Sequence, residues 1–221
     1  MLDKTVYIYY NMYTDLSREV SMNKKDEKIF KVFKTHKDFA RTKDILVTKI
    51  HSRDLKRAKD KGQIIQVKRG FYRLAEIPLI SNQGFIDLAR AIPEGVICLL
   101  SALSFYELTT FTPSVVSMAI CRGSRRPKID YPPAEFYHFS KKQFEAGISE
   151  IKIKSHKIHI YNPEKTICDC FRYRNKLGLD IAKEGLSEYL KHKDRNLERL
   201  LEYAEICRIK SLLQTWLNAM I

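Results

Sequence analysis

The feature that most limits the possible folds is a run of three short helical patterns followed directly by a hairpin pattern, within residues 24–76. The first pattern places apolar residues three and four positions apart over 29–33, which predicts an amphipathic helix of about three turns. A second, short helix is expected with Thr42 as its N-cap. A third is expected with Ser52 as its N-cap and Gly62 just beyond its end. The sequence therefore predicts three short helices, one after another.

A hairpin pattern follows the third helix. Apolar and polar residues alternate over 64–68, and Gly70 separates this run from the aromatic run FYRL. Glycine readily adopts a positive φ, so a tight turn is expected at Gly70. Helices followed by a hairpin with a basic tip are typical of a winged helix-turn-helix. The sequence therefore predicts such a DNA-binding domain over residues 24–80, preceded by a flexible N-terminal extension over 1–23.

Positive charge is concentrated in this same segment. The chain carries 40 Lys and Arg against 26 Asp and Glu, and residues 24–80 hold 17 of the former against 7 of the latter. Residues 81–221 hold 21 against 16. Such a local surplus is typical of a module that binds a polyanion, because contacts with phosphates release condensed counterions. A lysine-rich, solvated surface is the alternative interpretation.

The third helix predicts which side chains meet DNA. At about 100° per residue, Leu55 and Ala58 fall on its inner face, and Arg53, Lys56 and Arg57 fall on the opposite side. We expect Arg53 and Arg57 to read guanine edges, the first turn of the helix to hold a phosphate, and the wing to reach the DNA backbone or minor groove. The expected DNA-binding residues are Thr42, Ser52, Arg53, Lys56, Arg57, Lys59, Lys68 and Arg69.

Residues 81–221 predict a second, α+β domain. Runs of β-branched and aromatic residues predict a small, mostly antiparallel sheet. The expected strands are 115–120, 134–139, 148–153 and 157–161. The expected helices are one over about 85–92, one over the apolar stretch 96–108, one that begins at Pro163 with Asn162 as its N-cap, and three more over 179–192, 197–207 and 210–220.

The most distinctive loop of this domain is basic. It holds Arg122, Arg125, Arg126 and Lys128 within seven residues. Its Gly-Ser pair superficially resembles a nucleotidyltransferase signature, but the DxD or DxE pair that would hold Mg²⁺ does not follow. We interpret the loop either as an anion or nucleic-acid contact or as a solvated arginine loop.

The sequence contains no recognisable catalytic or metal motif. The five cysteines include no CxxC pair, and no HxH, HExxH, GxGxxG, GxxxxGK or GxSxG occurs. Cys168 and Cys170 are expected to be buried packing residues, and Lys165 with Asp169 is expected to form a surface ion pair. We therefore expect no catalytic residue, metal or cofactor. The longest apolar stretch is roughly half of what a membrane span needs, so a cytoplasmic protein is expected.

Four stretches have a familiar order and spacing: GQIIQVKRGFYRL, GVICLLSALSFYELTT, RGSRRPKIDYPP and YNPEKTICDCFRYRNKLGLDIAKEGL. Together, over about residues 27–218, they resemble the AbiEi family of antitoxins and transcriptional regulators from bacterial type IV toxin–antitoxin and abortive-infection systems. The resemblance implies a winged-helix domain that binds promoter DNA and represses its own operon. It also implies a C-terminal domain that neutralises a toxin similar to nucleotidyltransferases, without requiring a stable complex.

Three functions from different classes follow as hypotheses. The leading one is a non-enzymatic repressor and antitoxin that binds double-stranded DNA at inverted repeats in its own promoter. The second is a nuclease or transferase to which the N-terminal domain delivers nucleic acid, in which Asp130, Glu135 and Asp169 would converge on a metal ion. The third is a ligand-responsive repressor, which needs a concave apolar pocket with converging polar groups.

Overall fold

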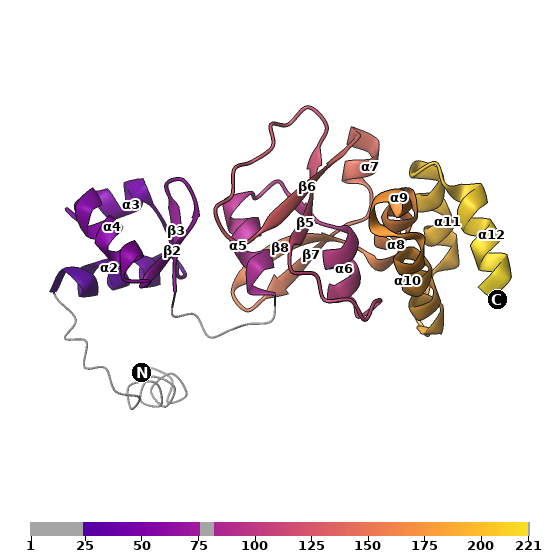
Figure 1. Cartoon of the computed structure of the whole chain (residues 1–221), viewed down its shortest axis with the longest axis horizontal. Helices are drawn as coiled ribbons and strands as arrows, with labels where there is room; N and C mark the ends of the chain where they lie inside the picture. The colour runs from indigo at the N-terminus through magenta and orange to yellow at the C-terminus, as the bar shows by residue number, and fades with distance from the viewer. Residues whose placement is uncertain (1–23, 76–81, 221) are drawn as a thin grey trace.

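The computed structural model describes residues 24–75 and 82–220 (Figure 1). The N-terminal extension expected over 1–23 lies outside the described residues. The expected domain boundary between residues 80 and 81 also lies outside them.

The N-terminal region has the expected helices and hairpin. Its helices are α2 (Lys24–Thr35), α3 (Thr42–Leu46) and α4 (Ser52–Asp60), and its strands are β1 (Phe39–Arg41), β2 (Ile64–Lys68) and β3 (Phe71–Leu74). The strands form an antiparallel sheet in the order β1-β3-β2. Gly70 takes a φ of +75° in the hairpin turn, as expected. Strand β1 was not expected, because three residues are too few to show a sequence period.

A core of its own holds the N-terminal helices together. Phe33 of α2, Ile45 of α3 and Leu55 and Ala58 of α4 are buried in one apolar cluster. The inner face predicted for α4 is therefore confirmed. These contacts produce the winged-helix-like arrangement on the left of Figure 1.

The second sheet has five strands in the order β6-β5-β4-β8-β7. Its strands are β4 (Val96–Ile97), β5 (Val116–Cys121), β6 (Ala134–Phe139), β7 (Ile148–Ile153) and β8 (His156–Tyr161). β4 with β5 and β7 with β8 pair antiparallel, whereas β4 with β8 and β5 with β6 pair parallel. The α+β class is confirmed, but the sheet is mixed rather than mostly antiparallel. Residue patterns indicate strands, whereas pairing direction depends on how the long connections run.

Eight helices accompany the described part of this sheet: α5 (Gln83–Ala91), α6 (Leu99–Phe105), α7 (Lys141–Glu145), α8 (Pro163–Arg172), α9 (Arg174–Leu177), α10 (Leu179–Lys191), α11 (Leu197–Ile206) and α12 (Lys210–Met220). Figure 1 shows α8 to α12 gathered at the C-terminal end of an elongated molecule. The buried helix expected over 96–108 begins only at Leu99, because Val96 and Ile97 form strand β4. Among the described residues, no helix is long and apolar enough to cross a bilayer.

The two sheets meet at a buried seam. Phe39, Val67 and Phe71 of the first sheet share one apolar cluster with residues of α5 and the second sheet, among them Ile86 and Ile158. The rings of Phe39 and Phe71 stack with their centroids 5.6 Å apart. The winged-helix region is therefore packed against the rest of the chain through its own sheet.

A buried ion pair also crosses the seam. Arg73 Nε of β3 lies 2.8 Å from Asp87 Oδ2 of α5, and the two side chains are 7% and 0% exposed. Gln83 donates a second hydrogen bond, of 2.8 Å, to Asp87 Oδ1. Burial raises the pKa of Asp87, although Arg73 and Gln83 act in the opposite direction.

Candidate nucleic-acid interface

The outer face of α4 is cationic and open to solvent. Ser52, Arg53, Lys56 and Lys59 are exposed. Asp54, which follows Arg53 in the sequence, is buried. The N-cap predictions for Thr42 and Ser52 are wrong, because each is the first helical residue and follows the N-caps Arg41 and His51, which have extended backbones. A duplex that reaches this face would meet one hydroxyl and three cationic side chains on successive turns.

Arg57 is not as free as Arg53, because its guanidinium contacts two carboxylates. Its Nη2 atom is 3.2 Å from Asp26 Oδ1 of α2 and 3.5 Å from Asp54 Oδ1. Lys61 Nζ lies 3.3 Å from the other oxygen of Asp26. Arg57 is therefore held at its guanidinium by carboxylates, although its side chain stays 37% exposed. A helical wheel shows the residues of one helix only, so it does not show the contact between Arg57 and the carboxylate of Asp26 on α2.

This contact also affects the acid. Burial alone would raise the pKa of Asp26, but hydrogen bonds from Lys61, Gln63 and Arg57 outweigh it and lower the pKa. Arg57 and Lys61 therefore hold α4 against α2 through a buried carboxylate. The orientation of the recognition helix depends on these contacts.

The wing is fixed on both sides. Thr42, at the start of α3, donates its backbone N–H to Gly70 O at 2.9 Å. Lys59 Nζ of α4 donates to Gln66 Oε1 of β2 at 2.8 Å.

The two cations of the wing lie differently. Arg69 is exposed at the turn. Lys68 is half-buried, and its ammonium donates to Ala91 O of α5. Lys68 therefore points into the seam and not outward from the wing tip as predicted.

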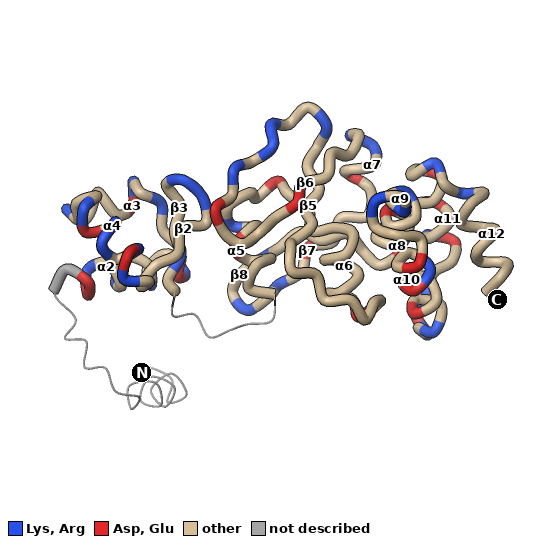
Figure 2. The backbone as a smooth tube through the Cα atoms, viewed as in Figure 1, with Lys and Arg blue, Asp and Glu red and all other residues tan. Residues whose placement is uncertain are grey.

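The basic loop of the second region reaches the wing. Asp130 and Tyr131 both donate their backbone N–H groups to Val67 O of β2, at 2.9 and 3.2 Å. Gln66 Nε2 donates to Asp130 Oδ2 at 2.7 Å. The four cations that precede this anchor are all exposed: Arg122, Arg125, Arg126 and Lys128. Figure 2 shows the blue segments of this loop and of the β2–β3 turn along the upper side of the molecule.

The three carboxylates that the enzyme hypothesis requires, those of Asp130, Glu135 and Asp169, each have different neighbours. Asp130 accepts from Gln66, and Glu135 accepts from Lys176 at 2.5 Å. Asp169 is sealed in the interior. Within residues 24–75 and 82–220, no three His, Cys, Asp or Glu side chains are grouped as a metal site requires.

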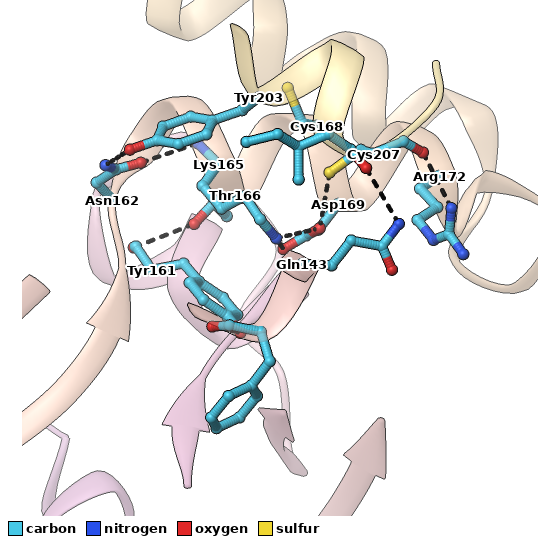
Figure 3. Close-up of polar contacts among 12 residues, drawn as sticks. Gln143, Tyr161, Asn162, Lys165, Thr166, Cys168, Asp169, Arg172, Tyr203 and Cys207 are labelled. Atoms are coloured by element: carbon cyan, nitrogen blue, oxygen red, sulfur yellow. Dashed lines mark hydrogen bonds and ion pairs between the residues drawn. The ribbon is translucent and has the colours of Figure 1, made fainter. Parts of the chain in front are cut away.

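A buried ion pair lies at the centre of the C-terminal helices (Figure 3). Lys165 Nζ is 2.6 and 2.5 Å from the two carboxylate oxygens of Asp169, and both side chains are 0% exposed. The ammonium also lies 4.3 Å from the ring centroid of Tyr161. Burial outweighs the effect of Lys165 and raises the pKa of Asp169. The prediction of a surface ion pair is therefore wrong.

The residues around this pair close it from solvent. Cys168 and Cys170 are fully buried, as predicted, and burial raises the pKa of both thiols. Cys207 donates its S–H to Asp169 Oδ1 over 3.4 Å. Gly147 passes so close that an added Cβ would lie 2.6 Å from Lys165 Cβ. The arrangement serves packing, because the described residues leave this pair no open path to solvent.

A cavity of about 450 Å³ lies at the seam on the β1 side, and no sequence pattern predicts it. Cations from both regions line it, including Lys37, Arg41 and Arg90. They are spread over 54 positions of the sequence and form no motif, so only the folded chain brings them together.

Comparisons with known proteins agree with the N-terminal geometry. Residues 27–75 match a family model described as "Transcriptional regulator, AbiEi antitoxin". Among solved structures, the chain is similar to the RV2827C protein from Mycobacterium tuberculosis, with 10% sequence identity and a TM-score of 0.56 over 89% of this chain and 82% of that one. At that identity the likeness concerns the fold alone. No curated protein matches the chain.

Proposed function

We propose that this chain, whose residues 27–75 carry the AbiEi antitoxin and transcriptional regulator domain, is the DNA-binding antitoxin of a type IV toxin–antitoxin system. In this proposal the winged-helix region represses the operon from which the protein is expressed. The remainder, residues 81–221, neutralises a nucleotidyltransferase-like toxin. The protein acts in the cytoplasm and has no enzymatic activity of its own.

One observation carries the DNA-binding half of the proposal. The segment that matches a transcriptional-regulator model contains a helix whose outer face presents Arg53, Lys56 and Lys59 to solvent. Cations on such a helix bind phosphates electrostatically, and arginine can also pair with guanine through two hydrogen bonds. In the proposal, these side chains supply both affinity and sequence recognition.

Each expected contact has a specific part in this proposal. Arg53 reads a base edge, because a planar guanidinium can form paired hydrogen bonds that lysine cannot. The half-buried Thr42 and the exposed Ser52, Lys56, Lys59 and Arg69 contact the DNA backbone. Arg57 and Lys68 act indirectly, by holding α4 against α2 and the wing against α5.

The basic loop extends this surface. Its end is anchored on β2 through Asp130 and Tyr131, directly after the four cations of residues 122–128. In the proposal, the loop contacts the phosphate backbone next to the half-site that α4 reads. The second region then contributes to DNA affinity as well as to toxin neutralisation.

A mobility-shift titration on the promoter of the operon tests the proposal. The change Arg53→Ala with Lys56→Ala should weaken promoter binding by about 1–3 kcal/mol for each lost base contact. A matched control changes Lys141 and Lys142 to Ala, since both are exposed on α7. Equal promoter affinity in the two double variants would overturn the assignment of α4.

The antitoxin half has its own test. A neighbouring gene for a nucleotidyltransferase-like protein should be toxic when expressed alone and harmless when expressed with this chain. Persistent toxicity during co-expression would refute that half and leave the DNA-binding half standing.

A further inference from the structure

We propose that the seam between the winged-helix region and the mixed sheet binds a small phosphate-bearing molecule. The site is the cavity of about 450 Å³ on the β1 side of the seam. Cavities of about 300–1,000 Å³ are usual for small-molecule ligands. The inference goes beyond the proposed function and does not depend on it.

The charge of the cavity favours an anion. Lys37 follows α2, Arg41 ends β1 and Arg90 lies on α5, so cations come from both regions. In the described part of the chain, no carboxylate oxygen lies within 4.0 Å of a charged nitrogen of these three side chains. Three cations without ion-pair partners in one concave site attract phosphate.

The two carboxylates that line the cavity interact with other lining residues, Arg41 and Lys157, and not with the side chains of the three cations. Asp44 accepts the backbone N–H of Arg41 at 3.0 Å. Glu150 pairs with Lys157, whose Nζ lies 2.7 Å from Oε1. Neither acid therefore neutralises the three cations through an ion pair, and the lining keeps a net positive charge.

The floor of the cavity is apolar and aromatic. Phe39 is buried there, and His156 of β8 meets its ring edge-on, with centroids 5.5 Å apart. The guanidinium of Arg90 lies 5.5 Å from the centroid of the same ring. A ligand that combines a phosphate with a flat apolar part would contact both the cations and the rings of the lining.

His156 adds a hydrogen-bond donor whose pKa should change when an anion binds. Burial lowers the pKa of His156, and the charges of Arg90 and Lys37 lower it further, whereas Asp38 opposes them. A bound phosphate would offset these charges and raise the pKa again. Binding should therefore be accompanied by proton uptake at His156.

The cavity lies away from the basic loop but adjoins one proposed DNA contact, because its lining residues Arg41 and Asp44 flank Thr42. The sheet order is β1-β3-β2, and the basic loop is anchored on β2, whereas the cavity lies against β1 at the opposite edge. A small ligand would there touch both regions at once. If the ligand changes how the two regions pack, it also changes the affinity for DNA. Coupling between two binding sites is reciprocal, so DNA would change the affinity for the ligand by the same factor.

Calorimetric titration of the full chain with inorganic pyrophosphate, at constant ionic strength, tests the proposal. We expect saturable binding that the change Lys37→Gln with Arg90→Gln weakens about tenfold or more, which corresponds to about 1.4 kcal/mol. The control, Lys141→Gln with Lys142→Gln on α7, removes the same charge elsewhere and should change the affinity less than about twofold. Absence of saturable binding, or equal weakening in both variants, would overturn the proposal.

Two further measurements keep the result interpretable. Arg41→Gln alters an exposed side chain, so a loss of pyrophosphate affinity there with an unchanged thermal midpoint supports a binding role. The salt dependence of DNA binding shows whether Lys37 and Arg90 bind a small phosphate compound or the phosphates of the DNA backbone. A slope smaller by about 2 in the Lys37 and Arg90 double variant would assign these cations to DNA and refute the small-molecule site, whereas an unchanged slope supports it. Pyrophosphate binding is measured without DNA, so it does not depend on whether the promoter is bound.

Discussion

Replacing Arg73 with Met should destabilise the fold strongly, because it leaves a carboxylate buried without its cationic partner. Asp87 is 0% exposed, and its hydrogen bond from Arg73 Nε is 2.8 Å long. After the change only Gln83 would still donate to this carboxylate. Removing one member of a buried ion pair costs about 3–5 kcal/mol. This is a large part of the total of about 5–15 kcal/mol that is typical of folded proteins.

The loss should depend on pH in a defined direction. Burial raises the pKa of Asp87 in the wild type, and removal of Arg73 should raise it further. A carboxyl whose pKa is raised by folding is favoured in its protonated form, so stability falls as pH rises through the folded pKa. Urea unfolding followed by circular dichroism should therefore show a larger loss for Arg73→Met at pH 8 than at pH 5.

A second substitution separates the ion pair from simple loss of packing. Asp87→Leu added to Arg73→Met removes the stranded charge, so the double variant should regain most of the lost stability. An Arg73→Met protein within about 0.5 kcal/mol of wild type at both pH values would refute the reasoning. A double variant less stable than the single one would do the same.

Three further substitutions test the packing described above. Lys165→Met should lower the free energy of unfolding by about 3–5 kcal/mol, and adding Asp169→Leu should restore most of it; unchanged urea midpoints would contradict this. Arg57→Ala should cost about 1–3 kcal/mol, because Asp26 loses a charged partner. The lowered pKa of Asp26 stabilises the fold above the unfolded pKa of about 3.9, and this contribution is lost as pH falls through the folded pKa, so Asp26→Asn should flatten the acid side of the pH–stability curve. Gly147→Ala should destabilise by about 1–3 kcal/mol, since the new Cβ meets Lys165 at a φ of +74°; a neutral result in thermal unfolding would show that the loop moves aside.

Local rules of helix and turn formation predicted much of the fold. Asn162 caps α8 as expected, and its side chain accepts the backbone N–H of Lys165 at 2.9 Å. The expected helix over 210–220 has the same bounds in the structure. Caps, glycine turns and amphipathic spacing involve residues within about four positions of one another, so the sequence shows them directly.

Features that depend on distant partners were not predictable in this way. Arg57 was expected to read a guanine edge, but its guanidinium contacts Asp26, which lies 31 positions earlier. Lys165 and Asp169 have the spacing of a surface pair, yet α6, α10 and α11 all pack against their helix and bury it. Strand direction in the mixed sheet and the cavity at the seam likewise arise only from long-range packing.

The salt dependence of promoter binding tests the central claim most directly. The claim is that α4 presents Arg53 and Lys56 to a duplex. Fluorescence anisotropy with promoter DNA at several salt concentrations should give a steep negative slope of log affinity against log salt. Changing both residues to Ala should reduce that slope by about 1 for each lost phosphate contact and remove the preference for the promoter over unrelated DNA. An unchanged slope and an unchanged preference in the variant would contradict the account.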